Sequence, residues 1–205
     1  MRDLLARYPQ LSKIENEIQA SLNVIIDCYQ NGGKILLCGN GGSAADCEHI
    51  VGELMKGFLS KRPINKEKRT LMKNNFPIEE ELLDKLQDGL PAISLPSLVA
   101  INSAVCNDID AGLIYAQQLV ALGKSGDVLV AISTSGNSKN VIEAVKVAKA
   151  LGIMVIGLTG NGGGKLKELS NVCICAPESE TYKIQELHLP IYHYLCAAVE
   201  KHFFK

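Results

Sequence analysis

Four side chains that could carry chemistry stand at helical spacing in two segments. His49 and Glu53 are four residues apart, and Gln185 and His193 are eight apart, so each pair lies roughly on one face of a helix. We expect the four to meet in one pocket, where imidazole, carboxylate and amide oxygen are acceptable ligands for a divalent cation such as zinc. The alternative is a chance pairing on a solvated helix, because His-x-x-x-Glu alone is a weak signal. His188, which is turned away from Gln185 and His193, is interpreted as a structural residue.

A hydroxyl-rich segment, ISTSGNS at residues 132–138, follows an apolar run and precedes a helical pattern. At such a junction, free backbone N–H groups and the positive end of the helix dipole converge, which attracts an anion. Gly136 permits a tight turn, and hydroxyl donors suited to a phosphate monoester come from Ser133, Thr134, Ser135 and Ser138. The segment therefore predicts a phosphate site. A loop that merely caps its helix is the alternative.

A second turn of the same kind follows an earlier apolar run, in CGNGGSAADCEH at residues 38–49. This turn opens the next helical pattern with Asn40, Gly41, Gly42 and Ser43. Two donor-lined turns at one edge of a sheet favour the phosphate site over simple capping. Neither turn matches G-x-G-x-x-G or G-x-x-x-x-G-K-[ST], so we expect no nucleotide cofactor.

Five short apolar runs bounded by Gly or Pro are typical of strands buried on both faces. Helical patterns alternate with them, which implies right-handed crossovers and a doubly wound parallel sheet covered by helices on both faces. Ligands of such sheets bind at the carboxyl ends of the strands, where both turns lie. The predicted strands are residues 34–38, 91–95, 127–133, 153–160 and 172–176, and the predicted helices include residues 43–58, 111–123, 137–152 and 180–204.

Two further segments are interpreted from their patterning. Residues 11–29 carry apolar side chains three or four apart, which predicts a long amphipathic helix with a narrow stripe typical of helix–helix packing. Residues 60–90 are charge-dense and contain two prolines, and only residues 79–87 indicate a short helix. We interpret residues 60–90 as a charged insertion at the surface, a solvated loop, with a substrate lid as the alternative.

The composition is that of one soluble globular domain, which we expect to cover residues 1–205. Apolar residues make up 47% of the chain and charged residues 21%, so a core can be buried. A net charge of −1 favours neither a nucleic-acid partner nor another acidic polymer. Because no apolar window is long enough for a membrane and the N-terminus is unlike a signal peptide, we expect a cytoplasmic protein. The seven scattered cysteines are interpreted as small buried hydrophobic residues.

Three stretches, LLCGNGGSAADCEHIVGEL, DVLVAISTSGNSKNVIEAVKVAKALGI and KIQELHLPIYHYLC, resemble the sedoheptulose 7-phosphate (phosphoheptose) isomerases of the sugar isomerase (SIS) fold. The resemblance covers nearly the whole chain apart from residues 60–90. It implies a flavodoxin-like, three-layer α/β sandwich with a five-stranded parallel sheet, assembled as a homotetramer. Active sites would then lie at subunit interfaces, and the first helix would help to form an intersubunit bundle.

The resemblance also implies roles for the residues already singled out. The two turns and Gln185 would bind the phosphate and nearby hydroxyls of a phosphorylated sugar. Relatives can hold zinc at a catalytic centre, which in this chain would be lined by His49, Glu53, Gln185 and His193.

Isomerisation between a ketose phosphate and an aldose phosphate moves a proton between adjacent carbons through an enediol. We predict Glu53 as the base that takes and returns the carbon proton, and His193 as the acid that serves the oxygens. The developing enediolate needs charge stabilisation, which a metal or an imidazolium could provide. A carboxylate that binds zinc is a poorer base, so the two roles of Glu53 compete.

Two segments depart from the pattern of the relatives. Leu95 and Pro96 stand at the turn of the second predicted strand, just after which the relatives usually carry an acidic residue. Tyr182 and Lys183 precede Ile184, where the relatives usually have a small or acidic residue and then Arg. Both changes fall where sugar hydroxyls would be read, so an isomerase of another phosphosugar is one alternative. A non-catalytic regulatory SIS protein that binds sugar phosphates is another, although the presence of both catalytic candidates argues against it.

Overall fold

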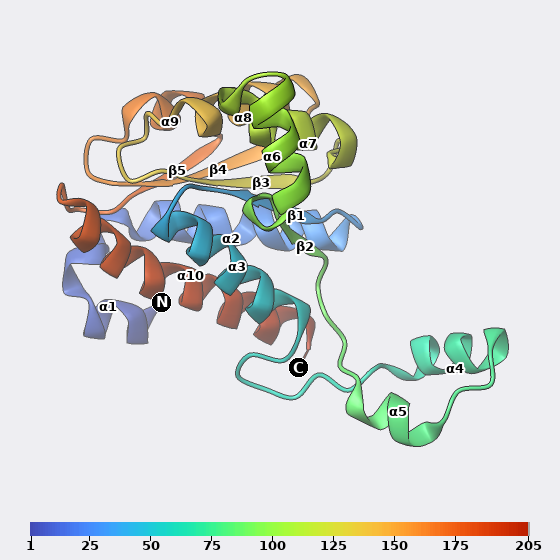
Figure 1. The fold of residues 1–205 in the computed structure, drawn as a ribbon. Coiled ribbons are helices and arrows are strands. Elements are labelled where there is room, and N and C mark those ends of the chain that lie inside the picture. The colour runs from blue at the N-terminus through green and yellow to red at the C-terminus, as the bar shows by residue number, and fades with distance from the viewer. Residues whose placement is uncertain (205) are drawn as a thin grey trace.

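A five-stranded parallel sheet forms the centre of the molecule (Figure 1). The computed structural model describes residues 1–204, in which the strands run in the order β2-β1-β3-β4-β5. All five predicted strands are present, and the predicted α/β architecture is confirmed. The strands are β1 (Ile35–Cys38), β2 (Ala92–Ser94), β3 (Val128–Ile132), β4 (Met154–Thr159) and β5 (Val172–Cys175).

Helices cover both faces of this sheet (Figure 1). Alternate residues of β1 enter different cores: Ile35 and Leu37 face one helical layer, and Leu36 faces the other. The strands are apolar throughout because both of their faces are buried. One layer contains α2 (Glu15–Gln30), α3 (Gly42–Met55) and α10 (Thr181–Phe203), and the other contains α7 (Ile114–Leu122), α8 (Lys139–Ala150) and α9 (Gly164–Leu169), with α6 (Val99–Asp108) packed against α7.

The N-terminal region differs from the single helix predicted over residues 11–29. A short helix α1 (Arg2–Arg7) is followed by a 3₁₀ turn (Pro9–Ile14), and α2 begins only at Glu15. The predicted apolar stripe is real, but Ile18 and Leu22 are already buried within this chain. Within this chain the sheet and α10 cover the stripe, and the part of the first helix in an intersubunit bundle stays a prediction.

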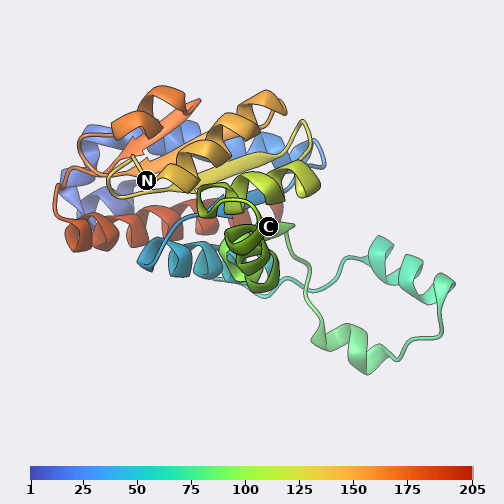
Figure 2. The same cartoon turned by 45° about the horizontal axis from the view of Figure 1, so that its top comes forward.

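Residues 60–90 form more regular structure than the loop predicted for them. α4 (Lys66–Asn75) begins after Asn65, whose side chain accepts a hydrogen bond from the Lys68 N–H, and α5 (Glu80–Lys85) follows. The two helices extend away from the rest of the molecule (Figure 2). We call residues 63–88 the arm.

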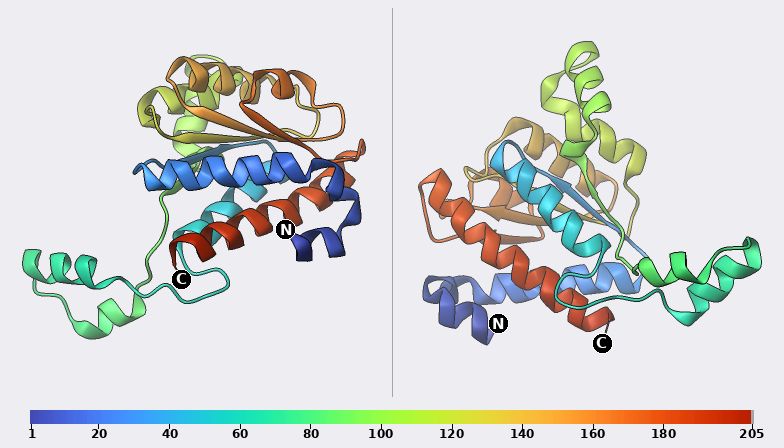
Figure 3. Two further views of the ribbon diagram at one scale, coloured as in Figure 1. Left: turned by 180° about the vertical axis from the view of Figure 1, so that it is seen from behind. Right: turned by 60° about the horizontal axis from the view of Figure 1, so that its bottom comes forward.

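The ends of the arm lie together. Pro63 and Gln87 form an antiparallel bridge, and the N–H of Asp88 donates to the carbonyl of Arg62 at 2.6 Å. The arm is thus a closed excursion that leaves and re-enters the body at one place (Figure 3).

Two smaller expectations can be compared with the structure. Across residues 1–204, none of the helices has the length and apolar character that a membrane crossing requires. All seven cysteines are free thiols; Cys28, Cys38, Cys47 and Cys196 are buried as expected, whereas Cys106 is exposed.

Candidate active site

The hydroxyl-rich loop after β3 keeps its side chains close to one another. The hydroxyls of Ser133 and Ser138 are 3.0 Å apart, and the Ser135 hydroxyl accepts a hydrogen bond from the Asn137 N–H at 3.2 Å. Ser138 is the N-cap residue of α8, but its side chain makes no capping hydrogen bond. Helix capping alone therefore does not explain this loop, which stands at the carboxyl end of a central strand.

Glycine is required for the shape of this loop. Gly136 has φ of 66°, and a Cβ placed there would lie 2.0 Å from the carbonyl oxygen of Gly163. The neighbouring turn is hydrogen-bonded to the loop, from the Gly160 N–H to the Thr134 carbonyl and from the Leu166 N–H to the Gly136 carbonyl, both at 3.0 Å. These bonds hold the loop in one conformation.

The donor-lined turn after β1 stands beside this loop. Because β1 pairs with β3, their carboxyl ends are adjacent, and the side-chain amides of Asn40 and Asn140 exchange hydrogen bonds at 2.8 and 2.9 Å. Gly41 has φ of 55°, and Gly42 and Ser43 begin α3. The structure thus brings the two predicted phosphate turns together.

Gln185, at the start of α10, belongs to this end of the site. A Cβ on Gly42 would lie 2.6 Å from its Nε2, so the glycine leaves space for the amide. Gln185 therefore lies against the first turn, near the predicted phosphate donors.

The other three predicted side chains form a cluster further along the same helices. The Nε2 atom of His49 is 3.3 Å from Oε1 of Glu53 and 3.3 Å from Nε2 of His193. Burial and the neighbouring His49 lower the pKa of His193, an effect that Glu53 opposes. The His49 side chain is 42% exposed, so the cluster is accessible from outside.

The four candidates consequently do not meet at one point within the chain. Eight residues of α-helix span about 12 Å, which separates Gln185 from His193 along α10. His49, Glu53 and His193 are together, whereas Gln185 contacts the turn at Gly42. The expectation of a single four-residue pocket holds for three of its members.

Comparison with known proteins gives consistent results. The SIS domain family profile matches residues 2–88 and 88–160. A phosphoheptose isomerase of Aneurinibacillus thermoaerophilus is 42% identical over 88% of this chain and 78% of that protein. One of Helicobacter pylori strain P12 is 37% identical over 94% of this chain and 88% of that protein. The solved phosphoheptose isomerase of Neisseria gonorrhoeae has a TM-score of 0.76 and 33% identity, covering 98% of this chain and 94% of that one.

This chain belongs to the phosphoheptose isomerase family. The family resemblance predicted from the three stretches, and with it the assignment to an aldose–ketose isomerase, is confirmed.

Two residues that adjoin the cluster, Asp46 and Tyr192, were not identified from the sequence. The Tyr192 hydroxyl is 3.1 Å from Oδ1 of Asp46 and 3.1 Å from Nδ1 of His49. Burial raises the pKa of the Asp46 carboxyl, although the hydrogen bond from Tyr192 opposes this. The available signal was the position of Asp46, one helical turn before His49, together with a tyrosine adjacent to His193.

The zinc that the resemblance implies can be tested against the donors present. A tetrahedral zinc with bonds of about 2.1 Å places its ligand atoms about 3.4 Å apart, and His49 Nε2 has this spacing to both Glu53 and His193. In donor type and in these two distances the residues fit zinc. Within residues 1–204, however, no group of three or more His, Cys, Asp or Glu side chains is arranged to hold a metal ion. Zinc therefore stays a prediction.

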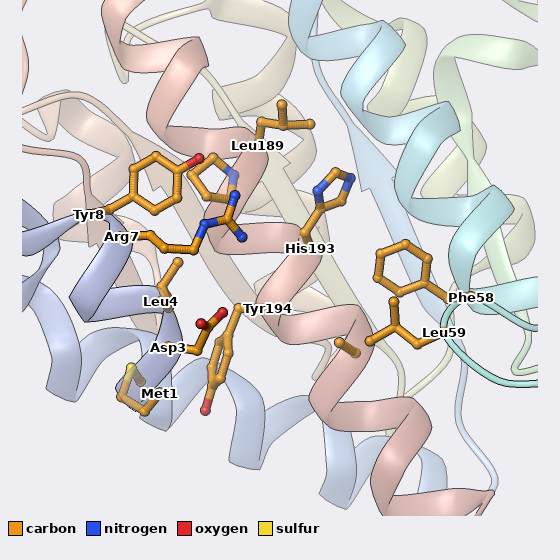
Figure 4. Close-up of a pocket in the computed structure, with 12 residues that line it drawn as sticks. Met1, Asp3, Leu4, Arg7, Tyr8, Phe58, Leu59, Leu189, His193 and Tyr194 are labelled. Carbon is orange, nitrogen blue, oxygen red and sulfur yellow. The ribbon is translucent and has the colours of Figure 1, made fainter.

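An open cavity of about 490 Å³ adjoins the cluster, between α1, α10 and the segment after α3 (Figure 4). His193 and Phe58 line one side of this cavity, and Arg7 and Tyr8 line the opposite side. Since His193 contacts His49 and also lines the cavity, its ring is accessible from this side.

Proposed function

We propose that the chain converts sedoheptulose 7-phosphate to D-glycero-D-manno-heptose 7-phosphate, acting as a single SIS domain over residues 1–205. The names of the most similar relatives support this substrate. The observation that carries the proposal is that one pair of packed helices, α3 and α10, joins the donor-rich turn after β1, which stands beside the loop after β3, to a His–Glu–His cluster.

The phosphate is bound by the two turns. Hydroxyl donors come from Ser43, Ser133, Thr134, Ser135 and Ser138, and further donors come from the backbone around Asn40, Gly41 and Gly42. Gln185 binds a hydroxyl of the sugar beside the phosphate. This arrangement stabilises the charge of the phosphate through many hydrogen bonds and needs no fixed cation near the reacting carbons.

The proton transfer uses the cluster. The Glu53 carboxylate removes the proton from C1 while His193 donates a proton to the carbonyl oxygen at C2, which yields the enediol. His193 then takes the proton of the C1 hydroxyl, and Glu53 returns its proton to C2, which leaves an aldehyde at C1. No proton is gained or lost over the cycle.

We further propose that His49, Glu53 and His193 hold one zinc ion per site, with Gln185 as the fourth donor. Bound zinc supplies charge stabilisation for the enediolate. Because Gln185 of the same chain lies about 12 Å from His193 along α10, we propose that the zinc takes the Gln185 of a second copy, as an alternative to its contact with the sugar, in a cytoplasmic homotetramer whose active sites lie at subunit interfaces. Membranes and nucleic acids have no part in this function.

Solvent exchange tests the proposed function directly. The wild-type protein, incubated with sedoheptulose 7-phosphate in D₂O, is expected to incorporate deuterium at the carbon next to the carbonyl. Glu53→Gln is expected to reduce this rate by roughly 10²- to 10⁴-fold, since it removes the base. Glu48→Gln, which changes an exposed carboxylate on the same helix, is the matched control and retains the rate.

The outcomes separate the alternatives. Exchange with another ketose phosphate but not with sedoheptulose 7-phosphate would support the isomerase activity and reject the proposed substrate. The feature that favours this result is the 3₁₀ turn at Leu95–Ser97, which stands in place of the relatives' acidic residue. Binding of the sugar phosphate without exchange would indicate a regulatory binding protein. Elemental analysis of the same preparation measures zinc per chain.

A further inference from the structure

Asp46, Tyr192 and His49 form a hydrogen-bonded chain that ends at the proposed reaction centre. The Tyr192 side chain is nearly fully buried, and its hydroxyl has two neighbours, Oδ1 of Asp46 and Nδ1 of His49, each at 3.1 Å. The other ring nitrogen of His49, Nε2, faces Glu53 and His193 at 3.3 Å. One hydroxyl therefore connects the half-buried carboxylate of Asp46 to the side of His49 that faces away from the reaction.

The donors and acceptors among Asp46, Tyr192 and His49 determine which atom donates in each of these hydrogen bonds. An ionised carboxylate only accepts hydrogen bonds, and the Tyr192 hydroxyl has a single proton, which it donates to Asp46. The hydroxyl oxygen then accepts from Nδ1 of His49, so the ring proton is on Nδ1. Within residues 1–204 the second carboxylate oxygen, Oδ2, is buried without a partner, so the side-chain bonding of Asp46 is directed at Tyr192.

We propose that Asp46 and Tyr192 are positioning residues that hold His49 in the tautomer protonated at Nδ1 and unprotonated at Nε2. This proposal rests on the proposed function only for the part of His49 in the reaction centre; the tautomer itself does not depend on that function.

The tautomer has consequences for each neighbour of Nε2. The single lone pair of an unprotonated Nε2 accepts a hydrogen bond from the Nε2–H of His193 when no metal is bound, and the same lone pair is the one that metal ligation requires in its place. It donates nothing to Glu53, whose carboxylate keeps its basicity. In the opposite tautomer, the Nε2–H would donate to Glu53 and weaken it as a base.

Nitrogen NMR reports the tautomer without any assay of activity. In protein labelled with ¹⁵N at histidine, long-range ¹H–¹⁵N correlations distinguish a protonated from an unprotonated ring nitrogen. His49→Gln assigns the resonances among the four histidines. We expect the wild-type protein, as isolated and after treatment with a chelator, to carry the proton on Nδ1. A proton on Nε2 of His49 in the chelated protein would overturn the proposal.

Tyr192→Phe and Asp46→Ala test the two positioning residues. Each is expected to abolish the preference for Nδ1–H and to lower kcat by roughly 10- to 100-fold, with a smaller change in KM. Tyr29→Phe is the matched control, because it removes the hydroxyl of another buried tyrosine, which is bonded to the Pro91 carbonyl at 3.3 Å and not to His49.

The NMR and exchange measurements distinguish failure of the positioning role from failure of the proposed function. If Tyr192→Phe leaves the His49 tautomer unchanged in a folded protein, the positioning role is rejected whatever the activity. If the predicted tautomer is found but the wild-type protein incorporates no deuterium from D₂O into sedoheptulose 7-phosphate, the proposed function fails and the positioning role stands.

Discussion

His188 illustrates how one residue can link the fold to pH. Its side chain is completely buried, with Nε2 at 3.2 Å from the carbonyl oxygen of Thr159 at the end of β4. Burial lowers the pKa of His188 from 6.5 to about 4, and the bond to Thr159 opposes this only in part. The neutral ring therefore serves as a core residue, as expected from its orientation in the sequence.

This burial predicts a pH-dependent stability. Between about pH 6.5 and pH 4 the unfolded chain binds a proton at His188 and the folded chain does not, so the free energy of unfolding is highest above pH 6.5 and falls as the pH decreases towards 4. The difference of about 2.5 pKa units corresponds to about 3 kcal/mol. Urea unfolding at several pH values should give a smaller slope for His188→Gln than for the wild type.

His202→Gln is the control for this prediction, because His202 is exposed. Its pH dependence should match that of the wild type. An unchanged slope in His188→Gln would show that other groups cause the dependence.

At the level of single residues, the sequence predicts contacts between side chains one turn apart on a helix, but it misses contacts that depend on the rise along a helix or on the packing of two elements. His49 and Glu53 are found because a spacing of four places both on one face of one helix. Gln185 and His193 also share a face, but spacing around a helix says nothing of the rise along it, which separates them by about 12 Å. Asp46 and Tyr192 can each be noticed from their positions near His49 and His193, but their contact joins two elements distant in sequence, so no local pattern shows that they meet.

Among the elements, α3 and α10 are tied together by a buried ion pair. Nε of Arg62 donates to Oε1 of Glu200 at 2.8 Å, and its two terminal nitrogens donate to the carbonyls of Leu54 and Glu53 at the end of α3. The Glu200 carboxylate also accepts the N–H groups of residues 58–60. Although burial alone would raise it, these N–H donors and Arg62 hold the pKa of Glu200 below its usual value. Arg62 thus fixes the backbone of Glu53.

Removal of one partner of this pair should be costly. Arg62→Met leaves the Glu200 charge buried without its cation, and we expect a loss of about 3–5 kcal/mol in the free energy of unfolding, measured with urea. The double variant Arg62→Met with Glu200→Gln should recover part of this loss, because its neutral amide still accepts the N–H groups.

Lys85→Met provides the comparison, since Lys85 and Glu81 form an exposed pair on the arm. We expect it to change stability by less than about 0.5 kcal/mol. A loss for Arg62→Met no greater than this would mean that the buried pair contributes little.

The elements missed by the sequence analysis share a physical property. α4 has no buried residue, and α6 buries only Val105, so neither helix carries an apolar stripe at helical spacing. The strands and the helices of the two cores were predicted because burial imposes such periodicity. Helices formed mainly by caps and surface ion pairs, such as those of Arg69 with Glu80 and Asp84, leave no comparable pattern.

On the scale of the molecule, the arm is separable from the two cores. Its buried apolar residues, Ile64 and Leu83, belong to neither core, and Leu71 and Phe76 are exposed. Replacement of residues 65–86 by a short Gly-Ser turn should therefore leave the body folded. The loop-closure term favours the shorter connection only weakly, by about 0.6 kcal/mol per halving of length.

Thermal unfolding of this deletion variant, compared with the wild type, measures the effect on the body, and deuterium exchange measures the effect on the site. We expect similar unfolding temperatures, since the bond from Asp88 to the Arg62 carbonyl and the ion pair of Arg62 are retained. A variant that fails to fold would show that the arm contributes to the body's stability.

The closed base of the arm also makes this position suitable for protein engineering. A foreign domain whose own termini are adjacent, such as a fluorescent reporter, could be spliced between Pro63 and Gln87 without stretching the host chain. A probe placed there would be anchored beside the last turn of α3, and its signal would report on the backbone that carries Glu53.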